Sequence, residues 1–271
     1  MSKTSKKVVI ITGGSSGIGK GCAEVFGKNG YSVFITGRNP EKLEEAIADL
    51  IAKDISANGL ACDVSQFEDN EKMFEACMKV FGRVDGLINN AGISMRALFS
   101  KTEVEVIERL MQINFFGTVY ATKVCVDEII KNDGFLVGVS SIAGYRGLPG
   151  RTGYSASKFA MQGFLESLRT ELYKSKVNVL IACPGYTESN IRNTALNSEG
   201  KQQGETPFDE SKLMSAETVA RHILKAIKKK KKYLTLTAQG KLTVFMNKWF
   251  PGFMDKLVYN AIAKEKDSPF K

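Results

Sequence analysis

Short apolar runs alternate with amphipathic helical patterns along the 271-residue chain, and this alternation restricts the fold more than any other feature. Because a helix between two strands returns the chain to the same end of a sheet, such connections form right-handed crossovers between parallel strands. The sequence therefore predicts an α/β fold: a doubly wound, mostly parallel sheet of about seven strands with helices on both faces. The predicted strands are Val8–Thr12, Ser32–Thr36, Leu60–Asp63, Val84–Asn89, Phe135–Ser140, Val177–Ala182 and Tyr233–Thr237.

The helical patterns and irregular stretches predict one main domain with an extension. Thr102 and Glu105 have the spacing of a capping box, which predicts one long helix from there to Lys131. Residues 1–240 are expected to form a single catalytic domain, and the polar stretch 190–212 a lid loop within it. Residues 241–271 are expected to form an amphipathic, basic C-terminal extension. The other predicted helices are Ser16–Lys28, Pro40–Lys53, Phe67–Phe81 and Tyr154–Tyr173.

The net charge of +9 comes entirely from the C-terminal part of the chain. From Lys225 onward, twelve lysines stand against three acidic residues, so the first 224 residues are neutral overall. Lys228–Lys232 form a lysine run without interleaved aromatic residues, which is thin support for nucleic-acid binding. We therefore expect no nucleic-acid partner.

The composition disfavours several other classes of protein. No apolar run approaches the roughly 18 residues of a membrane-spanning helix, and no signal-peptide core precedes the first strand. The five cysteines are scattered without a Cys-x-x-Cys pair, which favours buried, reduced thiols in a cytoplasmic protein. The single histidine, His222, lies in a helical pattern far from the motifs below. Neither a serine–histidine hydrolase nor a metal site is therefore expected.

A glycine-rich turn, Thr12-Gly-Gly-Ser-Ser-Gly-Ile-Gly19, joins the first strand to the first helix, which is the context of a dinucleotide-binding fingerprint. In such a turn one glycine makes the tight bend, one lets the backbone approach a pyrophosphate, and one lets the helix pack on the strand. The helix N-terminus then presents N–H groups to the phosphates. The predicted cofactor-binding residues of this turn are Gly13, Ser15, Ser16, Gly17, Ile18 and Gly19.

The end of the second strand indicates which dinucleotide binds. Thr36 stands where an acidic residue would bind the ribose 2′-hydroxyl of NAD, and Arg38 can pair with a 2′-phosphate. We therefore expect NADP(H). Asp63, after the third strand, has two interpretations: it accepts a hydrogen bond from the adenine amino group, or it caps the helix that follows.

Tyr154 and Lys158 lie four residues apart in a predicted helix, so both project from one face. A nearby ammonium group favours phenolate, and Lys158 is therefore expected to lower the pKa of Tyr154 from its usual value of about 10. Ser141, thirteen residues before Tyr154, can donate to the same carbonyl oxygen. An acid–base group beside a dinucleotide site predicts hydride transfer to or from a carbonyl.

With these motifs the chain resembles the short-chain dehydrogenase/reductase family from about Lys6 to His222. The matching elements are Thr12–Gly19, Asp63-Val64, Asn89-Asn-Ala-Gly92, Asn114, Ser141, Tyr154-x-x-x-Lys158 and Pro184-Gly185. The resemblance implies a Rossmann-type fold and a catalytic set of Asn114, Ser141, Tyr154 and Lys158. It implies that Tyr154 is the acid in reduction and the base in oxidation. Lys158 would grip the nicotinamide ribose and share a proton path with Asn114.

The resemblance also extends the cofactor site beyond the glycine-rich turn. After Pro-Gly the family often has a β-branched apolar residue and, two positions on, a threonine that binds the carboxamide. This chain has Thr187 and Ser189, and which hydroxyl touches the nicotinamide stays open. The added cofactor-binding residues are Asp63, Val64, Asn90, Ala91, Gly92, Tyr154, Lys158, Pro184, Gly185, Thr187 and Ser189.

The substrate is expected to be a small carbonyl compound, and a lipophilic one fits the sequence best. Some segments look similar to 3-ketosphinganine reductases and others to membrane-associated steroid and acyl-dihydroxyacetone-phosphate reductases. The alternatives are a reductase of soluble carbonyls such as 3-oxoacyl thioesters, and an NADP-sensing binding module without turnover. By resemblance the pocket would form from Ser94–Arg96, Ala143–Gly150, Tyr186 and the loop 190–212, in a homodimer or homotetramer.

The C-terminal extension has apolar residues at three- and four-residue spacing, which predicts one broad apolar helical face. Lys228–Lys232 precede it, and Lys241, Lys248 and Lys256 flank it. This composition is typical of an interfacial membrane helix, and equally of a helix that packs over the substrate mouth or against a second subunit. A cytoplasmic protein with peripheral membrane contact is thus one alternative. The apolar residues are Leu242, Phe245, Met246, Trp249, Phe250, Phe253, Met254, Leu257 and Val258.

Overall fold

The computed structural model describes residues 6–185, 187–188, 191–204, 213–265 and 268–270. Within these residues, seven parallel strands form one sheet in the order β3-β2-β1-β4-β5-β6-β7. The order reverses between β1 and β4, and this switch point is where α/β sheets bind ligands, at the carboxyl ends of the strands. The strands are β1 (Val8–Ile11), β2 (Ser32–Gly37), β3 (Ala57–Ala61), β4 (Gly86–Asn89), β5 (Phe135–Val139), β6 (Asn178–Cys183) and β7 (Tyr233–Thr235).

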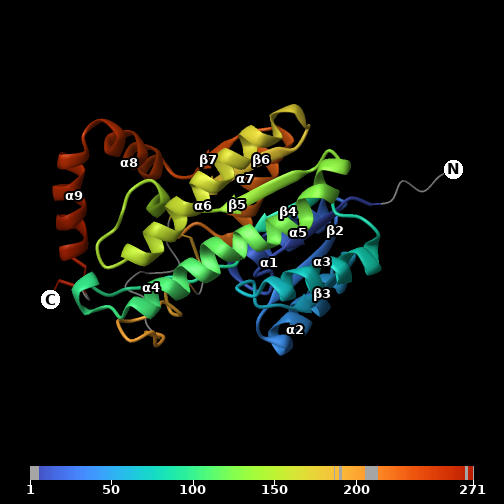
Figure 1. The fold of residues 1–271 in the computed structure, drawn as a ribbon, viewed down its shortest axis with the longest axis horizontal. Helices are drawn as coiled ribbons and strands as arrows, with labels where there is room; N and C mark the ends of the chain where they lie inside the picture. Colours follow the sequence, from blue (N-terminus) through green and yellow to red (C-terminus); the bar gives the residue numbers. More distant parts are fainter. Residues whose placement is uncertain (1–5, 186, 189–190, 205–212, 266–267, 271) are drawn as a thin grey trace.

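Helices cover both faces of the sheet, which confirms the predicted doubly wound architecture (Figure 1). One face carries α1 (Gly17–Lys28), α2 (Pro40–Ile51) and α7 (Ala216–Lys228). The opposite face carries α3 (Phe67–Phe81), α4 (Val104–Leu110), α5 (Gly117–Lys131) and α6 (Thr152–Glu171).

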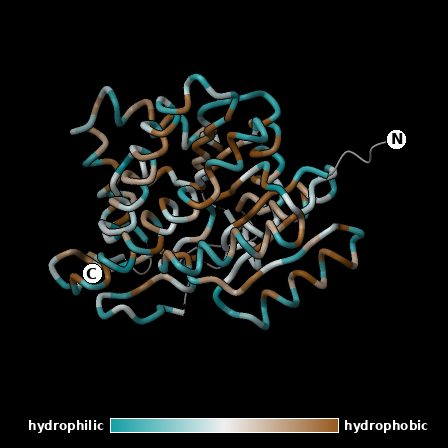
Figure 2. The backbone as a smooth tube through the Cα atoms, turned by 45° about the vertical axis from the view of Figure 1, so that its right-hand side comes forward, coloured by the Kyte–Doolittle hydropathy of each residue, from teal (hydrophilic) through white to brown (hydrophobic). Residues whose placement is uncertain are grey.

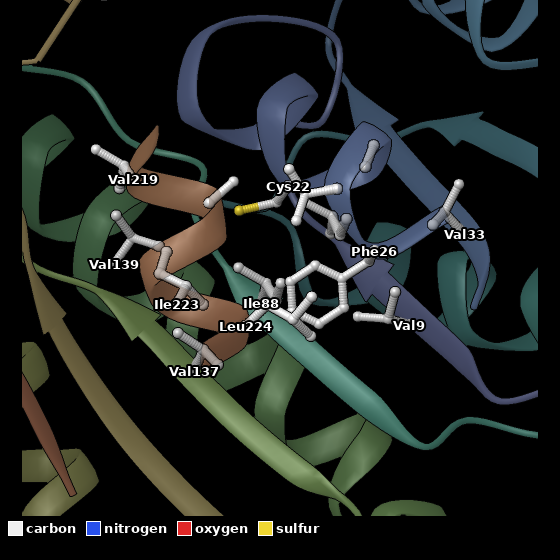
Figure 3. Close-up of a cluster of buried hydrophobic side chains, with 14 of the residues drawn as sticks. Val9, Cys22, Phe26, Val33, Ile88, Val137, Val139, Val219, Ile223 and Leu224 are labelled. Atoms are coloured by element: carbon white, nitrogen blue, oxygen red, sulfur yellow. The ribbon is translucent and has the colours of Figure 1, made fainter. Parts of the chain in front are cut away.

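The strands read as continuous apolar runs because both of their faces are buried. In β1, Val9 and Ile11 pack under α1 and α7, whereas Val8 and Ile10 belong to the cluster on the other face. Figure 3 shows the first of these clusters, in which Phe26 of α1 and Ile223 of α7 meet side chains of the sheet. Figure 2 shows the hydrophobic stretches of the backbone gathered in the middle of the molecule.

The third strand lies earlier in the chain than the predicted Leu60–Asp63, since β3 spans Ala57–Ala61. It is the edge strand of the sheet and is only partly buried, so it lacks the apolar run that marks the inner strands. A Cβ atom on Gly59 would lie 2.3 Å from the carbonyl oxygen of Ile35, so β3 approaches β2 too closely for any other residue there. Close packing between the strands, and not an apolar sequence pattern, therefore determines where β3 lies in the chain.

The predicted capping box at Thr102 and Glu105 is wrong. Thr102 directly follows the 3-10 turn η1 (Phe99–Lys101). Its hydroxyl donates to the carbonyl oxygen of Leu98 at 2.8 Å. Helix α4 begins at Val104, and its N-cap Glu103 makes no side-chain capping bond. The predicted single helix is also interrupted by a π-helical turn, η2 (Met111–Phe116), which separates α4 from α5.

The C-terminal extension folds into two helices, α8 (Ala238–Trp249) and α9 (Pro251–Ala263), at one border of the molecule (Figure 1). On α9, Met254, Val258 and Ile262 are buried against Leu148, Met246 and Phe270. The predicted single apolar face is therefore divided into a buried part and an exposed part. Among the described residues, no helix has both the length and the apolar character needed to cross a membrane.

The remaining sequence predictions for single residue types agree with the structure. All five cysteines are buried thiols without disulfide partners. His222 is exposed on α7, and its Nδ1 lies 2.8 Å from the carbonyl oxygen of Thr218 one turn earlier. His222 therefore makes its contact within its own helix, as its helical pattern indicated.

A buried carboxylate at the amino end of β4 supports the sheet, and replacing it should unfold the protein more easily. Asp85 accepts from the Val8 N–H at 2.8 Å and from Arg83 Nη2 at 2.6 Å. Asp85→Ala leaves both donors without this partner, and we expect a loss of roughly 2–4 kcal/mol in unfolding free energy. The urea midpoint measures it. Asp49→Ala, which breaks an exposed pair with Lys20, should cost much less. Equal losses would contradict this interpretation.

Candidate active site at the carboxyl edge of the sheet

The glycine-rich turn has the backbone that its sequence predicts. Gly13 and Gly17 adopt φ values of +64° and +50°, a left-handed conformation that favours glycine. A Cβ atom on Gly19 would lie 2.1 Å from the carbonyl oxygen of Gly13, so α1 packs on the turn too closely for a side chain. Ser15, Ser16 and Ile18 lie between these glycines at the start of α1.

Thr12 and Asn90 tie this turn to the end of β4. The Thr12 hydroxyl accepts from the N–H groups of Asn90 and Ala91 at 3.0 and 3.1 Å. In return, the Asn90 amide donates to the carbonyl oxygens of Thr12 and Gly13 at 2.9 and 3.1 Å. The predicted cofactor residues Asn90, Ala91 and Gly92 are thereby held against the glycine-rich turn at the switch point of the sheet.

The start of α1 suits an anionic group. Its N-cap, Ser16, makes no side-chain capping bond, and its first turn has no acidic residue. The first N–H groups of a helix lack partners within the helix and carry the positive end of its dipole. Arg38 is exposed directly after β2, and a Cβ atom on Gly37 would lie 2.9 Å from Ser15 Oγ. Ser15 and Arg38 thus lie near each other where a 2′-phosphate is expected, and the residues fit a dinucleotide.

Asp63 bonds within its own loop. Its Oδ1 accepts from the N–H and the hydroxyl of Ser65 at 3.0 and 2.7 Å, in the turn before α3. These bonds do not cap α3, whose N-cap is Gln66, so the capping interpretation is wrong and the adenine interpretation stays a prediction. Val64 is buried and packs beside Gly117 at the start of α5. Both residues lie at the carboxyl end of β3, on the same edge of the sheet as the glycine-rich turn.

Tyr154, Ser141 and Lys158 come together as predicted. Ser141 follows β5, and its hydroxyl forms a hydrogen bond with the Tyr154 side chain. Lys158 lies one turn after Tyr154 on α6, with its Nζ 5.8 Å from the centroid of the Tyr154 ring. The Lys158 ammonium is buried and donates to the carbonyl oxygen of Val139 at 2.9 Å.

Asn114 completes this cluster from the π-helical turn η2. Its Oδ1 accepts from the Ile93 N–H at 2.8 Å, and its Nδ2 donates to the Ser157 hydroxyl at 2.9 Å. The Ser157 hydroxyl donates in turn to the Tyr154 carbonyl oxygen at 2.8 Å. A Cβ atom on Gly92 would lie 3.0 Å from Asn114 Oδ1 and 3.5 Å from Lys158 Nζ. Asn114 and Lys158 therefore meet beside Gly92, and the contacts through Ser157 and Lys158 connect Tyr154 and Ser141 to them.

The pKa of Tyr154 differs from the sequence-based expectation. Burial raises it above its ordinary value, and this effect is the largest one. The hydrogen bond from Ser141 and the charges of Arg151 and Arg192 lower the pKa in opposition. The expected lowering by Lys158 is absent because burial also lowers the pKa of that amine, to about 8.

The segment after β6 is only partly described. Pro184 is buried, and Gly185 lies close to Thr237, since a Cβ atom there would be 3.2 Å from Thr237 Oγ1. Thr187 is buried, and its hydroxyl donates to the carbonyl oxygen of Gly185 at 3.1 Å. Tyr186 and Ser189 lie outside the described residues, so the choice between Thr187 and Ser189 stays a prediction.

A small cavity lies beside Arg151, three residues before Tyr154 in the chain. The predicted pocket residues Ser94, Met95 and Arg96 join part of the predicted lid loop, because Arg96 N–H donates to the carbonyl oxygen of Leu196 at 2.8 Å. Residues 190 and 205–212 of that loop lie outside the described residues. The lining residues are Ser94, Met95, Arg96, Arg151, Arg192, Ala195 and Gln203.

The predicted pocket segment Ala143–Gly150 is covered by the C-terminal helices. Arg146 donates to Asp255 at 2.6 Å and to Asn247 at 3.1 Å. The C-terminal end of the chain reaches the same mouth, since Arg96 pairs with Glu265 at 2.7 Å and Pro269 packs against Gly150. The extension therefore covers one side of the predicted substrate pocket.

Sequence reasoning missed several residues that shape this site. Arg151 precedes Tyr154 by three positions and Ser157 follows it by three, and neighbours at this spacing share a helix face. That spacing was the available signal for both. Arg192 and Glu265 carried no local signal, because their contacts with Thr187 and Arg96 span loops or most of the chain.

Lys158 should make stability depend on pH in a defined window. Its pKa is about 8 in the fold and 10.5 ordinarily, so unfolding takes up a proton between these values and stability rises with pH across the window. Relative to Lys158→Met, the wild-type protein should gain up to roughly 3 kcal/mol there. Urea denaturation at several pH values checks this, with the exposed Lys123→Met as control. Parallel wild-type and Lys158→Met profiles would refute it.

Comparison with known proteins shows which family the chain is similar to. A family model described as short chain dehydrogenase matches residues 7–200. The Mus musculus protein named dehydrogenase/reductase SDR family member 7B is 34% identical over 270 residues, which cover 96% of this chain and 83% of that protein.

Two solved structures share the fold. A short chain dehydrogenase/reductase from Burkholderia phymatum, in complex with NAD, superimposes with a TM-score of 0.83 at 21% identity, covering 94% of this chain and 97% of the other. A variant of actinorhodin polyketide ketoreductase with NADPH gives a TM-score of 0.74 at 25% identity, covering 84% and 92%. From the family match and the relative's identity, the chain belongs to the short-chain dehydrogenase/reductase family of oxidoreductases.

Proposed function

We propose that the protein is an NADP(H)-dependent reductase of a lipophilic carbonyl compound. The observation that carries the proposal is the connected cluster of Ser141, Tyr154, Lys158 and Asn114, in which Asn114 and Lys158 meet beside Gly92, next to the glycine-rich turn. A complete acid–base group also argues against a binding module without turnover.

The residues of this chain supply the proton and hold the reacting oxygen. A bound nicotinamide nucleotide supplies the hydride. The Ser141 hydroxyl lies beside Tyr154, and on substrate binding its single proton can turn from Tyr154 to the carbonyl oxygen and stabilise the developing negative charge. Tyr154 then gives its proton to that oxygen, and in oxidation it accepts the proton back. The cationic form of Lys158 stabilises the phenolate that remains.

Asn114 acts through its neighbours. Its bonds to Ile93 and Ser157 hold the ends of two segments that carry the site, and Ser157 is bonded to the backbone of Tyr154. We assign Asn114 the role of a positioning residue in this proton-transfer group. The π-helical turn around it is the kind of helix irregularity found often at functional sites.

The preference for NADP(H) is supported by charge at the end of β2. Arg38 is exposed beside Ser15, and the buried Thr36 replaces the acidic residue that would bind a ribose 2′-hydroxyl. An arginine binds a 2′-phosphate through charge-assisted hydrogen bonds. The structural neighbours do not decide this point, because one is in complex with NAD and another with NADPH.

A lipophilic substrate is supported by the cover of the pocket. The segment Ala143–Gly150 contacts α9 through Leu148, which packs with Met254 and Val258. Apolar walls of this kind favour an apolar ligand body, with a few polar groups to orient it.

A second copy of the chain is the proposed protein partner. Helices α4, η2 and α6 expose large apolar side chains, namely Val104, Phe116 and Phe159. Exposed apolar side chains on adjacent helices mark interaction surfaces. We assign this surface to a homodimer or homotetramer interface.

The first test of the proposed reaction is NADPH oxidation over a panel of ketones. The panel contains 3-ketosphinganine, a keto-steroid, an acyl-dihydroxyacetone phosphate and a 3-oxoacyl thioester. We expect turnover of a long-chain or steroid ketone, and a loss of at least about 1,000-fold in Tyr154→Phe, which keeps the ring but lacks the proton. Tyr173→Phe, an exposed tyrosine on another surface, is the control. Turnover of the thioester alone would refute a lipophilic substrate.

Arg38 should discriminate between the two nucleotides. Arg38→Gln removes the charge that pairs with the 2′-phosphate, and we expect kcat/KM for NADPH to fall by roughly 10- to 100-fold. The value for NADH should stay within about twofold, because NADH has no phosphate at this position. Arg221→Gln, which alters an exposed arginine of α7, should change neither value. A parallel fall for NADH and NADPH would mean that Arg38 does not read the phosphate.

A further inference from the structure

The helices α8 and α9 are fixed to the protein by their inner sides. Met254, Val258 and Ile262 of α9 are buried in a cluster with Leu148. On α8, Asn247 donates to the carbonyl oxygen of Tyr145 at 2.9 Å and accepts from Arg146. These contacts determine which side of each helix points away from the sheet.

The opposite side of the pair is apolar and exposed. We name it the outer face, and define it by six residues whose side chains are about half exposed or more. On α8, Leu242, Phe245 and Trp249 follow three- and four-residue spacing, so they share one side of the helix. Phe253 and Leu257 do the same on α9. The outer face consists of Leu242 (60% exposed), Phe245 (57%), Trp249 (61%), Phe250 (54%), Phe253 (58%) and Leu257 (47%).

The charges around the outer face are almost all positive. Lys241, Lys248 and Lys256 are exposed on the same two helices. The only acidic residue of α8 and α9 is Asp255, and it pairs with Arg146. The run Lys228–Lys232 does not contribute, because it precedes β7 and lies at the amino edge of the sheet, where Lys228 bonds to Asn29.

We propose that the outer face docks on the surface of a lipid bilayer that contains anionic lipids. Trp, Phe and Leu on one side of a helix with lysines at its margins is the composition of interfacial helices. Anionic headgroups attract each such lysine near the surface. A second copy of this chain fits the face less well, since a two-fold contact would bring the three lysines of each copy together without carboxylates to pair with.

Docking in this way places the substrate mouth at the lipid. The inner sides of α8 and α9 cover the segment Ala143–Gly150, and the outer face points away from it. In Figure 1, α9 forms the border of the molecule at that end. A lipophilic substrate would then reach the pocket from the bilayer without crossing water. This last consequence rests on the proposed function, whereas the docking itself does not.

Trp249 is the single tryptophan of the chain and belongs to the outer face, so its fluorescence reports on docking directly. We expect its emission to shift to shorter wavelength when vesicles of phosphatidylcholine and phosphatidylserine are added to the full-length protein. Lipids with brominated acyl chains should quench it. The shift should weaken with phosphatidylcholine alone or at high salt, because both remove the attraction for lysines. An emission spectrum unchanged by vesicles would overturn the proposal.

Matched variants separate docking from folding and from catalysis. The double variant Phe245→Ser/Phe253→Ser should lower vesicle co-sedimentation by roughly tenfold or more, because it removes two large apolar side chains from the outer face. Tyr173→Ser, an aromatic side chain that is 84% exposed elsewhere, should leave co-sedimentation unchanged. NADPH binding without vesicles should be equal in all three proteins. This readout distinguishes a failed docking proposal from a failed reductase proposal.

If a second copy of the chain covered the outer face, the fluorescence and size-exclusion results would differ. The Trp249 shift would then appear on raising protein concentration without lipid, together with a larger species in size-exclusion chromatography that Phe245→Ser/Phe253→Ser abolishes. That outcome would overturn docking on lipid.

Discussion

The hydrogen bonds that join Thr12 to Asn90 are the constraint on which the rest of the site depends. They lock the ends of β1 and β4 together at the point where the strand order reverses. With these ends fixed, the glycine-rich turn and the segment that leads to Ile93 have a single relative position. Ile93 then binds Asn114, and Asn114 reaches α6 through Ser157. The nucleotide half and the proton-transfer half of the site are thus one connected set of bonds.

Burial changes the pKa values of the two side chains that can transfer a proton, Tyr154 and Lys158. The Lys158 amine is removed from water, and a backbone carbonyl of β5 is the partner that it keeps. Burial disfavours charge on both Tyr154 and Lys158, so it raises the pKa of the phenol and lowers that of the amine, and the two values move apart. Burial therefore favours the neutral phenol, which is the form of Tyr154 that can donate a proton.

Much of the fold could be predicted, because inner parallel strands are buried on both faces and must be apolar throughout. The cofactor turn and the Tyr154–Lys158 pair were predictable for a similar reason, since helix geometry and backbone sterics restrict which residues fit. The edge strand β3 and the π-helical turn at Asn114 were not predictable, because packing against neighbours determines both. Spacing on the C-terminal extension identified apolar positions, but only tertiary contacts separated Met254 from Phe253.

The ion pair between Arg96 and Glu265 joins residues 169 positions apart, and this separation orders the assembly of the molecule. The bonds of the nucleotide half involve residues between Thr12 and Asn114, which emerge first during synthesis. Chains grow from the N-terminus and domains begin to fold as they emerge. The predicted substrate mouth, in contrast, is completed by Glu265 and Pro269, which are made much later. A nascent chain would therefore contain both partners of the Thr12–Asn90 bonds before it contains the residues that close the pocket.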